Sequence, residues 1–254
     1  MRVLNKRFGI TQLQTILIMG IVSLILFAMI AVPFYNAYKK KFTVSRLLVL
    51  YSTLVKANRE YAVINGEDVG HFDSNMTVNN FAERYFLPYM PISYYCKGQQ
   101  NDCWNTPQYT DLKGNKKINQ ALYSIVMQNN TVIGFHRDTN GYISLIVDID
   151  GKSGYNKLGK DVFLISFYDN NNKPTICAPE EYEKFNVKDG FHFGGYDKCG
   201  IPVDVYAVDE LMSETFPDGC NKKAPALISG TGVGSSCLPI IKANSWTIDK
   251  KYPW

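Results

Sequence analysis

Residues 15–34 of the chain read TILIMGIVSLILFAMIAVPF, an almost unbroken apolar run of twenty residues. No charged residue occurs from Ile10 to Tyr38. A helix of about twenty residues rises about 30 Å, which matches the hydrocarbon thickness of a bilayer. The sequence therefore predicts one transmembrane helix over residues 10–38.

Three interpretations of this apolar run compete: a cleaved secretory signal, an ordinary signal anchor, and a long helix that follows a short, separately cleaved leader. A secretory signal has an apolar core of about 7–15 residues, followed by small residues at the cleavage site. Here the core is longer and runs into Pro33-Phe34-Tyr35, without an A-x-A pattern. Three positive charges lie in residues 1–7 and three more at residues 39–41, so charge alone does not orient the segment.

Helical periodicity continues beyond the apolar run. From Val44 onward, large residues recur at every third or fourth position, as one face of a helix requires. These residues are Leu47, Tyr51, Leu54 and Tyr61. The spacing predicts an amphipathic continuation of the helix over residues 39–66, ended by Asn65-Gly66, because Asn and Gly tolerate the left-handed conformation of a C-cap. We expect the apolar face to pack on the protein's own sheet; a coiled coil with another chain is the alternative, with fewer than three heptads to support it.

Composition indicates a folded domain beyond the anchor. The chain has 254 residues, enough for one globular domain after the predicted membrane helix. Hydrophobic residues make up 46% and charged residues 20%, both near globular averages. The formal net charge is +4, and the positive groups that flank the apolar run account for it. Since no Arg-rich stripe with interleaved aromatic residues occurs, we expect no nucleic-acid partner.

Beyond the helix, the hydrophobic pattern changes to the alternation that is typical of strands. Strands are predicted over residues 121–128, 131–136, 142–147 and 161–168. The short connections between them require antiparallel neighbours. Residues 67–120 and 169–254 are mixed and loop-rich. The predicted fold class is α+β: a long N-terminal helix, its first half transmembrane, packed against an antiparallel β-sheet, with a disulfide-containing, loop-rich C-terminal region.

Six cysteines all lie beyond the apolar run, and they predict disulfides in an oxidising compartment. Zinc is the competing interpretation, but no C-x-x-C pair is present, and structural zinc sites favour such spacings. Six cysteines allow fifteen pairings. Because short loops close with the least loss of entropy, neighbours in sequence are expected to pair. The predicted bridges are Cys96–Cys103, Cys177–Cys199 and Cys220–Cys237.

The segment before the apolar run resembles the N-terminal motif of prepilins. Residues 6–15 read KRFGITQLQT, the end of a short basic leader followed by the start of the long helix. The resemblance implies that a prepilin peptidase cleaves after Gly9, so that residues 1–9 are a leader peptide. Ile10 would become the mature, methylated N-terminus, and Thr11 matches the Thr that is usual at the second position.

The chain departs from the prepilin pattern at three positions. Ile10 stands where Phe is usual, Gln14 replaces the usual Glu, and Pro33 falls about two residues later than the common helix-breaking proline. The Glu carboxylate is thought to meet the N-terminal amine of a neighbouring subunit within lipid. Gln14 can hydrogen-bond to that amine but cannot neutralise it. This favours a minor or tip subunit over a major, self-polymerising one; a membrane-resident relative that never polymerises is the other interpretation.

Later segments are also similar to a bacterial type IV pilin-like and type II secretion pseudopilin-like family. The resemblance implies an exported globular domain over residues 67–254 and a single-pass protein of the bacterial inner membrane, which could leave the membrane in a cell-surface filament. It implies other pilin or pseudopilin subunits as partners. The similar segments are residues 38–52, Phe81–Tyr89, Val147–Gly151, Leu158–Phe163, Trp246 and Tyr252–Trp254.

The loop from Asp148 to Asp161 concentrates oxygen ligands. It is not an EF-hand, because its glycine comes at the fourth place and Gly159 stands at the twelfth. Two interpretations stay open. The carboxylates could bond their own backbone amides in an Asx-rich turn. Alternatively, calcium, the one cofactor suggested by the sequence, could bind through Asp148, Asp150, Asn156 and Asp161.

Catalysis has little support in the sequence. His71, His136 and His192 lie in separate segments, and neither an H-E-x-x-H nor a G-x-S-x-G motif is present. The glycine-rich run Gly230–Ser236 lacks the Lys-Ser/Thr ending of a phosphate-binding loop, so we interpret it as an ordinary loop. We therefore expect a structural subunit, not an enzyme. A membrane-anchored extracytoplasmic binding protein or adhesin that does not polymerise is the alternative.

Overall fold

The computed structural model describes residues 12–66, 72, 76–98, 103, 108–119, 123–137, 141–151, 153, 156–169, 176–227 and 232–254. The chain divides into two compact units, residues 1–42 and residues 43–254. Helix α1, Gln12–Asn65, is 54 residues long and contributes to both units. Each unit is described by itself below.

The described part of the first unit is the apolar half of α1. Over the described residues, this half contains one helical segment that is long and apolar enough to cross a membrane, and its most apolar window is 0% buried. Large apolar side chains such as Phe27 and Phe34 are 71% and 74% exposed. Pro33 lies inside the helix and does not end it. One candidate membrane-spanning helix is therefore present, as the sequence predicts.

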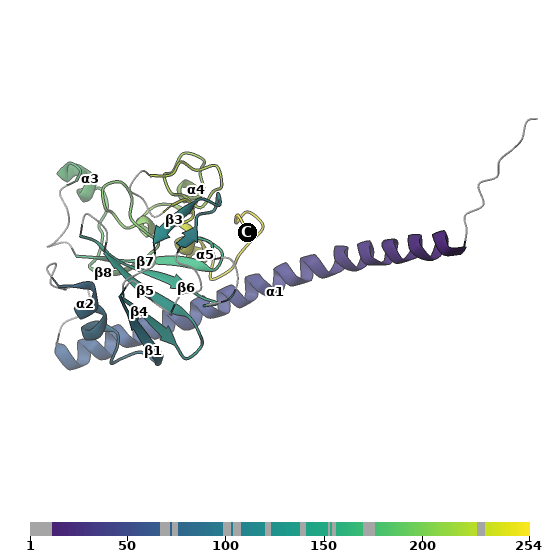
Figure 1. The fold of residues 1–254 in the computed structure, drawn as a ribbon. Helices are drawn as coiled ribbons and strands as arrows, with labels where there is room; N and C mark the ends of the chain where they lie inside the picture. The colour runs from purple at the N-terminus through teal and green to yellow at the C-terminus, as the bar shows by residue number, and fades with distance from the viewer. Residues whose placement is uncertain are drawn as a thin grey trace, which may run out of the picture. The chain divides into compact units, whose positions relative to one another are not determined.

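The second unit is built on a six-stranded antiparallel sheet with the order β1-β4-β5-β6-β7-β8 (Figure 1). The strands of this sheet are β1 (Ile92–Lys97), β4 (Tyr123–Met127), β5 (Val132–Arg137), β6 (Ile143–Asp148), β7 (Val162–Tyr168) and β8 (Gly190–Phe193). A separate two-stranded sheet pairs β2 (Gln108–Thr110) with β3 (Lys116–Asn119). Short helices complete the unit: α2 (Val78–Tyr85), α3 (Pro179–Glu183), the 3-10 helix η2 (Val203–Val205), α4 (Val208–Leu211) and α5 (Cys237–Ala243).

The four predicted strands correspond to the meander β4 to β7, and the α+β fold class is confirmed. Strands β1 and β8 were not expected, since they fall in segments that the sequence pattern presents as loop-rich. The reason is visible in β1, where Tyr94 and Tyr95 are both about half exposed at the edge of the sheet. A strand with adjacent exposed residues has no alternating pattern to detect.

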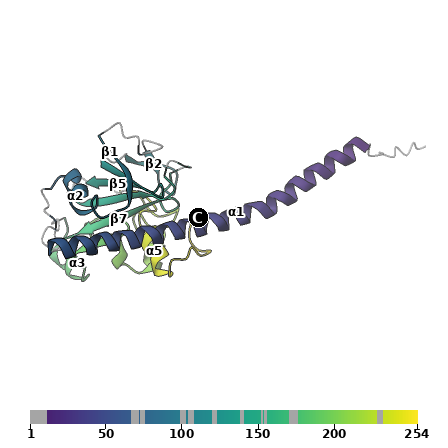
Figure 2. The same ribbon diagram turned by 90° about the horizontal axis from the view of Figure 1, so that it is seen from below.

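One face of the sheet is covered by the domain's half of α1. Figure 2 shows this half of the helix running along the sheet. The predicted apolar stripe is buried in the main core, where Leu47, Leu54 and Tyr61 are at most 2% exposed. Tyr51 packs against the rings of Phe193 and Trp246, with centroid distances of 5.6 and 5.4 Å. The helix face is thus covered by the protein's own sheet, as expected.

The C-terminus of α1 has the predicted cap. The helix ends at Asn65, and the amide of Gly66 donates to the carbonyl of Ala62 over 2.9 Å. Gly66 has a φ of +77°, a left-handed conformation that glycine adopts without strain. The Asn65-Gly66 pair therefore ends the helix as the sequence predicts.

The opposite face of the sheet is also buried. Side chains alternate along β7: Phe163, Ile165 and Phe167 face the core that contains α1, while Val162 and Leu164 face a second cluster. That cluster includes Tyr109 of β2 and Leu158 of the connection between β6 and β7. All seven residues of β7 are consequently buried. Leu158, in the connection between β6 and β7, is therefore packed against the interior.

Replacing Leu54 by Ala should destabilise the domain by about 2–5 kcal/mol, because it opens a cavity where α1 meets the sheet. Leu48→Ala is the matched control, since Leu48 lies on the same helix but is 41% exposed, and a change within about 0.5 kcal/mol is expected there. Chemical unfolding of the detergent-solubilised full chain measures both free energies. Equal losses for the two variants would contradict packing of this stripe on the sheet.

Candidate functional site

The predicted processing and assembly positions are placed only in part. Gly9, Ile10 and Thr11 lie outside the described residues. Gln14 and Pro33 are exposed on the apolar half of α1. The roles of all five in processing and assembly stay predictions.

The structure confirms all three predicted disulfides. The S–S distances are 2.05 Å for Cys96–Cys103, 2.04 Å for Cys177–Cys199 and 1.98 Å for Cys220–Cys237. No cysteine in the described part of the chain is free. Each bridge joins neighbouring cysteines in sequence, and the third joins the segment after α4 to the start of α5.

Asp148 ends β6 and opens the connection to β7, where it is 0% exposed. One of its oxygens, Oδ1, accepts hydrogen bonds from the amides of Asp150 at 3.3 Å and Gly151 at 2.9 Å. Gly151 has a φ of +67°, and a Cβ there would lie 2.3 Å from the carbonyl oxygen of Asn130. The Asx-turn interpretation is therefore right for this oxygen. The other oxygen, Oδ2, has no hydrogen-bond partner in the described part of the chain.

Asn156 is held from the opposite side of the loop. Its backbone carbonyl accepts from the amide of Thr110 at 3.0 Å and from the Thr110 hydroxyl at 3.2 Å. Asn156 is only 4% exposed. Neither Oδ1 nor Nδ2 of its side chain has a hydrogen-bond partner of good geometry among the described residues. The strand β2 therefore fixes the backbone of Asn156 and leaves a buried polar group unsatisfied.

Asp161 closes the connection just before β7. Its Oδ1 accepts from the amide of Lys157 at 2.5 Å. Like Asp148, it uses one carboxylate oxygen to hold the backbone of its own loop. In both Asp148 and Asp161, Oδ1 thus accepts a hydrogen bond from a backbone amide of the loop.

The pKa values of Asp148 and Asp161 both depend on neighbouring acidic groups. Burial raises the pKa of Asp148 to about 9, with the charges of Asp150 and Asp161 adding to the effect. Burial also raises the pKa of Asp161 to about 7 against the hydrogen bond from the Lys157 amide, and Asp150 adds to the increase. Burial raises the pKa of the Tyr109 hydroxyl above its ordinary value. The charge of Asp148 adds to this increase, the hydrogen bond with the Asn156 side chain reduces it, and the charge of Asp161 adds a smaller increase. Asp148, Asn156 and Asp161 therefore lie around one buried hydroxyl.

This cluster does not enclose a metal as it stands. Across the residues that the structure describes, no three acidic, histidine or cysteine side chains converge closely enough to hold an ion. Three positions of the same loop, residues 152, 154 and 155, lie outside the description. The predicted calcium ligation therefore stays a prediction at this point.

His192 has an acidic partner. Its Nδ1 lies 2.8 Å from Oδ1 of Asp204, and its Nε2 lies 2.7 Å from the carbonyl of Lys188. Ser166 stands opposite His192 in the pairing of β7 with β8. This resembles the order of a catalytic triad, but Nε2 is directed to a carbonyl, and Ser166 is 0% exposed, out of reach of a substrate. His71 lies outside the described residues.

The described end of the glycine-rich run has a structural role. Gly232 donates its amide to Oδ2 of Asp218 at 3.2 Å, and the hydroxyls of Ser235 and Ser236 each donate to the carbonyl of Asp218 at 3.2 Å. These donors hold the loop beside the Cys220–Cys237 bridge. They are therefore not directed at a phosphate.

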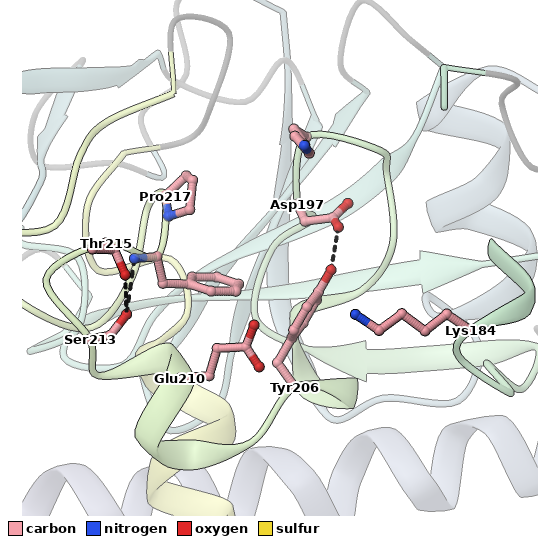
Figure 3. A pocket seen from close by; sticks show the side chains of 9 residues that line it. Lys184, Asp197, Tyr206, Glu210, Ser213, Thr215 and Pro217 are labelled. Atoms are coloured by element: carbon pink, nitrogen blue, oxygen red, sulfur yellow. Dashed lines mark hydrogen bonds between the residues drawn. The ribbon is translucent and has the colours of Figure 1, made fainter. Parts of the chain in front are cut away.

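An open cleft of about 330 Å³ lies in the C-terminal part of the domain (Figure 3). At its centre the hydroxyl of Tyr206 donates to Oδ2 of Asp197 over 2.5 Å. Asp197 is held by the amides of Cys199 and Ile201, each 2.8 Å from Oδ1. The remaining lining residues are Lys184, Lys198, Glu210, Ser213, Thr215, Phe216 and Pro217. No sequence motif marks this cleft, because its walls come from segments that approach each other only in the folded domain.

No protein-family model, no curated protein and no solved structure matches this chain. The architecture itself, a long N-terminal apolar helix whose domain half packs on an antiparallel sheet, is pilin-like.

The His192–Asp204 pair predicts a pH-dependent contribution to stability. Burial opposes the charged form of His192, but the Asp204 carboxylate prevails and raises the pKa above 6.5. When the pKa of a group is higher in the folded state than in the unfolded state, its stabilisation of the fold is complete at a pH below the unfolded-state pKa. This stabilisation is lost as the pH rises through the folded-state pKa. Asp204→Asn should therefore destabilise the domain more at pH 5.5 than at pH 8.5. Urea unfolding at both pH values measures this; the same loss at each would count against a charged pair.

Proposed function

We propose that this chain is a pilin-like or pseudopilin-like structural subunit, minor rather than major, of a type IV pilus or a type II secretion-like filament. The observation that carries the proposal is helix α1, one continuous helix from Gln12 to Asn65. Its first half is apolar and exposed on all sides, and its second half is buried on one face. A helix of this composition can lie among lipids or among other apolar helices while its far end carries a domain.

The sequence before this helix supports the same proposal. The leader-like residues 1–9 and the Gly9-Ile10 junction resemble a prepilin processing site. Three disulfides agree with a domain that folds outside the cytoplasm, in an oxidising compartment. The proposed location is therefore the bacterial inner membrane, single pass, with residues 67–254 outside the cytoplasm. The proposed partners are a prepilin peptidase and other pilin or pseudopilin subunits.

Gln14 is the basis for proposing a minor subunit. An amide in lipid can satisfy hydrogen bonds, but it leaves the positive charge of a neighbouring N-terminal amine uncompensated. A filament made only of this chain would repeat that uncompensated charge at every subunit. A position at the tip, or between subunits that carry a carboxylate, avoids the repetition.

The cleft at Tyr206 favours a second candidate, a membrane-anchored extracytoplasmic binding protein that does not polymerise. Its lining combines aromatic, hydroxyl and charged groups, which are the groups that a polar ligand requires. Mechanical shearing of cells distinguishes the candidates. A filament subunit is released together with its polymer, whereas an anchored binding protein stays in the membrane fraction.

Co-expression with a prepilin peptidase should yield a mature chain that begins at N-methylated Ile10. Gly9→Ala should block this cleavage, since the peptidase acts next to the glycine. Gly20→Ala is the matched control, because a Cβ at Gly20 meets nothing within 4 Å, and processing should be unchanged. Intact-mass spectrometry of the membrane fraction gives the result. A chain that still begins at Met1, or a cut beyond Phe34, would exclude the proposed subunit class.

A further inference from the structure

We propose that the cleft at Tyr206 binds a neutral saccharide, either a free sugar or the terminal sugar of a glycan. This inference deepens the second candidate function and rests on it, because it names the ligand that an extracytoplasmic binding protein would take. The volume of the cleft, about 330 Å³, lies near the lower end of the range for small-molecule sites, which is about 300–1,000 Å³. A space of this size suits a small ligand, or the end of a longer one.

One wall of the cleft is a turn that the fold holds in place without a ligand. Oδ1 of Asp197 accepts from the amides of Cys199 and Ile201, and the Cys177–Cys199 disulfide ties the same turn to an earlier segment. Two backbone hydrogen bonds close the turn: the amide of Asp197 donates to the carbonyl of Ile201 at 2.9 Å, and the amide of Gly200 donates to the carbonyl of Asp197 at 3.1 Å. The Asp197 carboxylate therefore needs little ordering when a ligand binds.

Tyr206 is fixed both at its hydroxyl and at its ring. The hydroxyl donates to Oδ2 of Asp197 at 2.5 Å, as Figure 3 shows. The ring packs against Phe185 and Phe216, with centroid distances of 4.8 and 5.0 Å. A sugar ring presents CH groups on its faces, and these pack against apolar and aromatic side chains. Tyr206, Phe216 and Pro217 supply the apolar part of the lining for such a face.

The polar lining offers both kinds of partner that a sugar hydroxyl uses. The carboxylate of Glu210 only accepts hydrogen bonds, the ammonium groups of Lys184 and Lys198 only donate, and the hydroxyls of Ser213 and Thr215 do both. All of these residues are exposed except the half-buried Ser213, so a ligand can reach them. Because each sugar hydroxyl is at once a donor and an acceptor, it can bond to a carboxylate and to an ammonium group together. Hydrogen bonds to charged groups are about twice as strong as those between neutral groups.

The charges of the lining favour a neutral ligand over a charged one. Asp197 and Glu210 balance Lys184 and Lys198, and the two signs are mixed, since Asp197 and Lys198 are successive residues. At the centre of the cleft, burial raises the pKa of the Tyr206 hydroxyl, and the hydrogen bond and charge of Asp197 and the charge of Glu210 add to the effect. An anion would meet this negative potential, and a cation would meet the two ammonium groups. A neutral hydroxylated ligand avoids both penalties.

The test uses the full chain in a polyoxyethylene detergent, because the head groups of alkyl glycoside detergents are themselves sugars. The chain is applied to a glycan array and then titrated by calorimetry with glucose, galactose, mannose and N-acetylglucosamine. One of these sugars should bind with a Kd in the low millimolar range. Array binding that the free sugar displaces identifies a glycan terminus as the source of the ligand, and binding of the free sugar alone identifies the soluble sugar.

The absence of binding both on the array and in the titrations would overturn the proposal. Glycylglycine is titrated in parallel, and a dipeptide that binds as tightly as the best sugar would overturn the choice of a neutral ligand. Sugar binding is measured on the solubilised chain, whereas shearing of cells reports where the chain resides. Failure of this inference is therefore distinguishable from failure of either candidate function.

Glu210→Gln should weaken sugar binding at least ten-fold, because an amide replaces the charged acceptor of the cleft. Glu214→Gln is the matched control: Glu214 is a nearby exposed glutamate, but it pairs with Lys223 at 2.6 Å and does not line the cleft, so the affinity should not change. Since both side chains are exposed, both variants should keep the Tm of the unaltered chain. Unchanged affinity in Glu210→Gln, or an equal loss in both variants, would overturn the location of the site in this cleft.

Discussion

Burial of one stripe of α1 by the sheet is the interaction on which the rest of the domain depends. Leu47, Leu50 and Leu54 are at most 2% exposed, and Tyr61 is 1% exposed. Each fully buried side chain of this size contributes about 1.5–3 kcal/mol, against a net stability of about 5–15 kcal/mol for a whole domain. Without the helix, the sheet would present a row of large apolar side chains to water. The sheet and the second half of α1 therefore fold as one unit.

The position of the buried polar loop follows from this arrangement. Because α1 covers one face of the sheet, and β2 with its neighbours covers the other, Asp148 and Leu158 of the connection between β6 and β7 are buried, whereas Ser153 is exposed. Asp148 stands in register with Val132 on one side and Val162 on the other, inside the pairing of three strands. A carboxyl group at such a position loses its hydration, which is why burial raises its pKa to about 9. The chemistry of this loop is thus a consequence of how the sheet is covered.

Much of the fold could be predicted from local signals in the sequence. The spacing of Leu47, Leu54 and Tyr61 gave the buried face of the helix, and alternating residues with short turns gave β4 to β7. The edge strand β1 could not be found, because exposed Tyr94 and Tyr95 follow each other without alternation. For the Asp148–Asp161 loop, the sequence showed the oxygen ligands but not their burial. Burial depends on Tyr109 and Thr110, which lie about forty residues earlier in the chain and approach only through the two-stranded sheet.

The disulfide pattern has a consequence for how the domain can form. Each cysteine pairs with the next one along the chain, at separations of 7, 22 and 17 residues. The meander β4 to β7 likewise pairs each strand with the one before it. If the chain crosses the membrane from its N-terminal end, each bridge can form as soon as the second cysteine of its pair has been translocated. No cysteine then stays unpaired while a distant partner is still inside. In this order, each native bridge can form without another bridge being broken first.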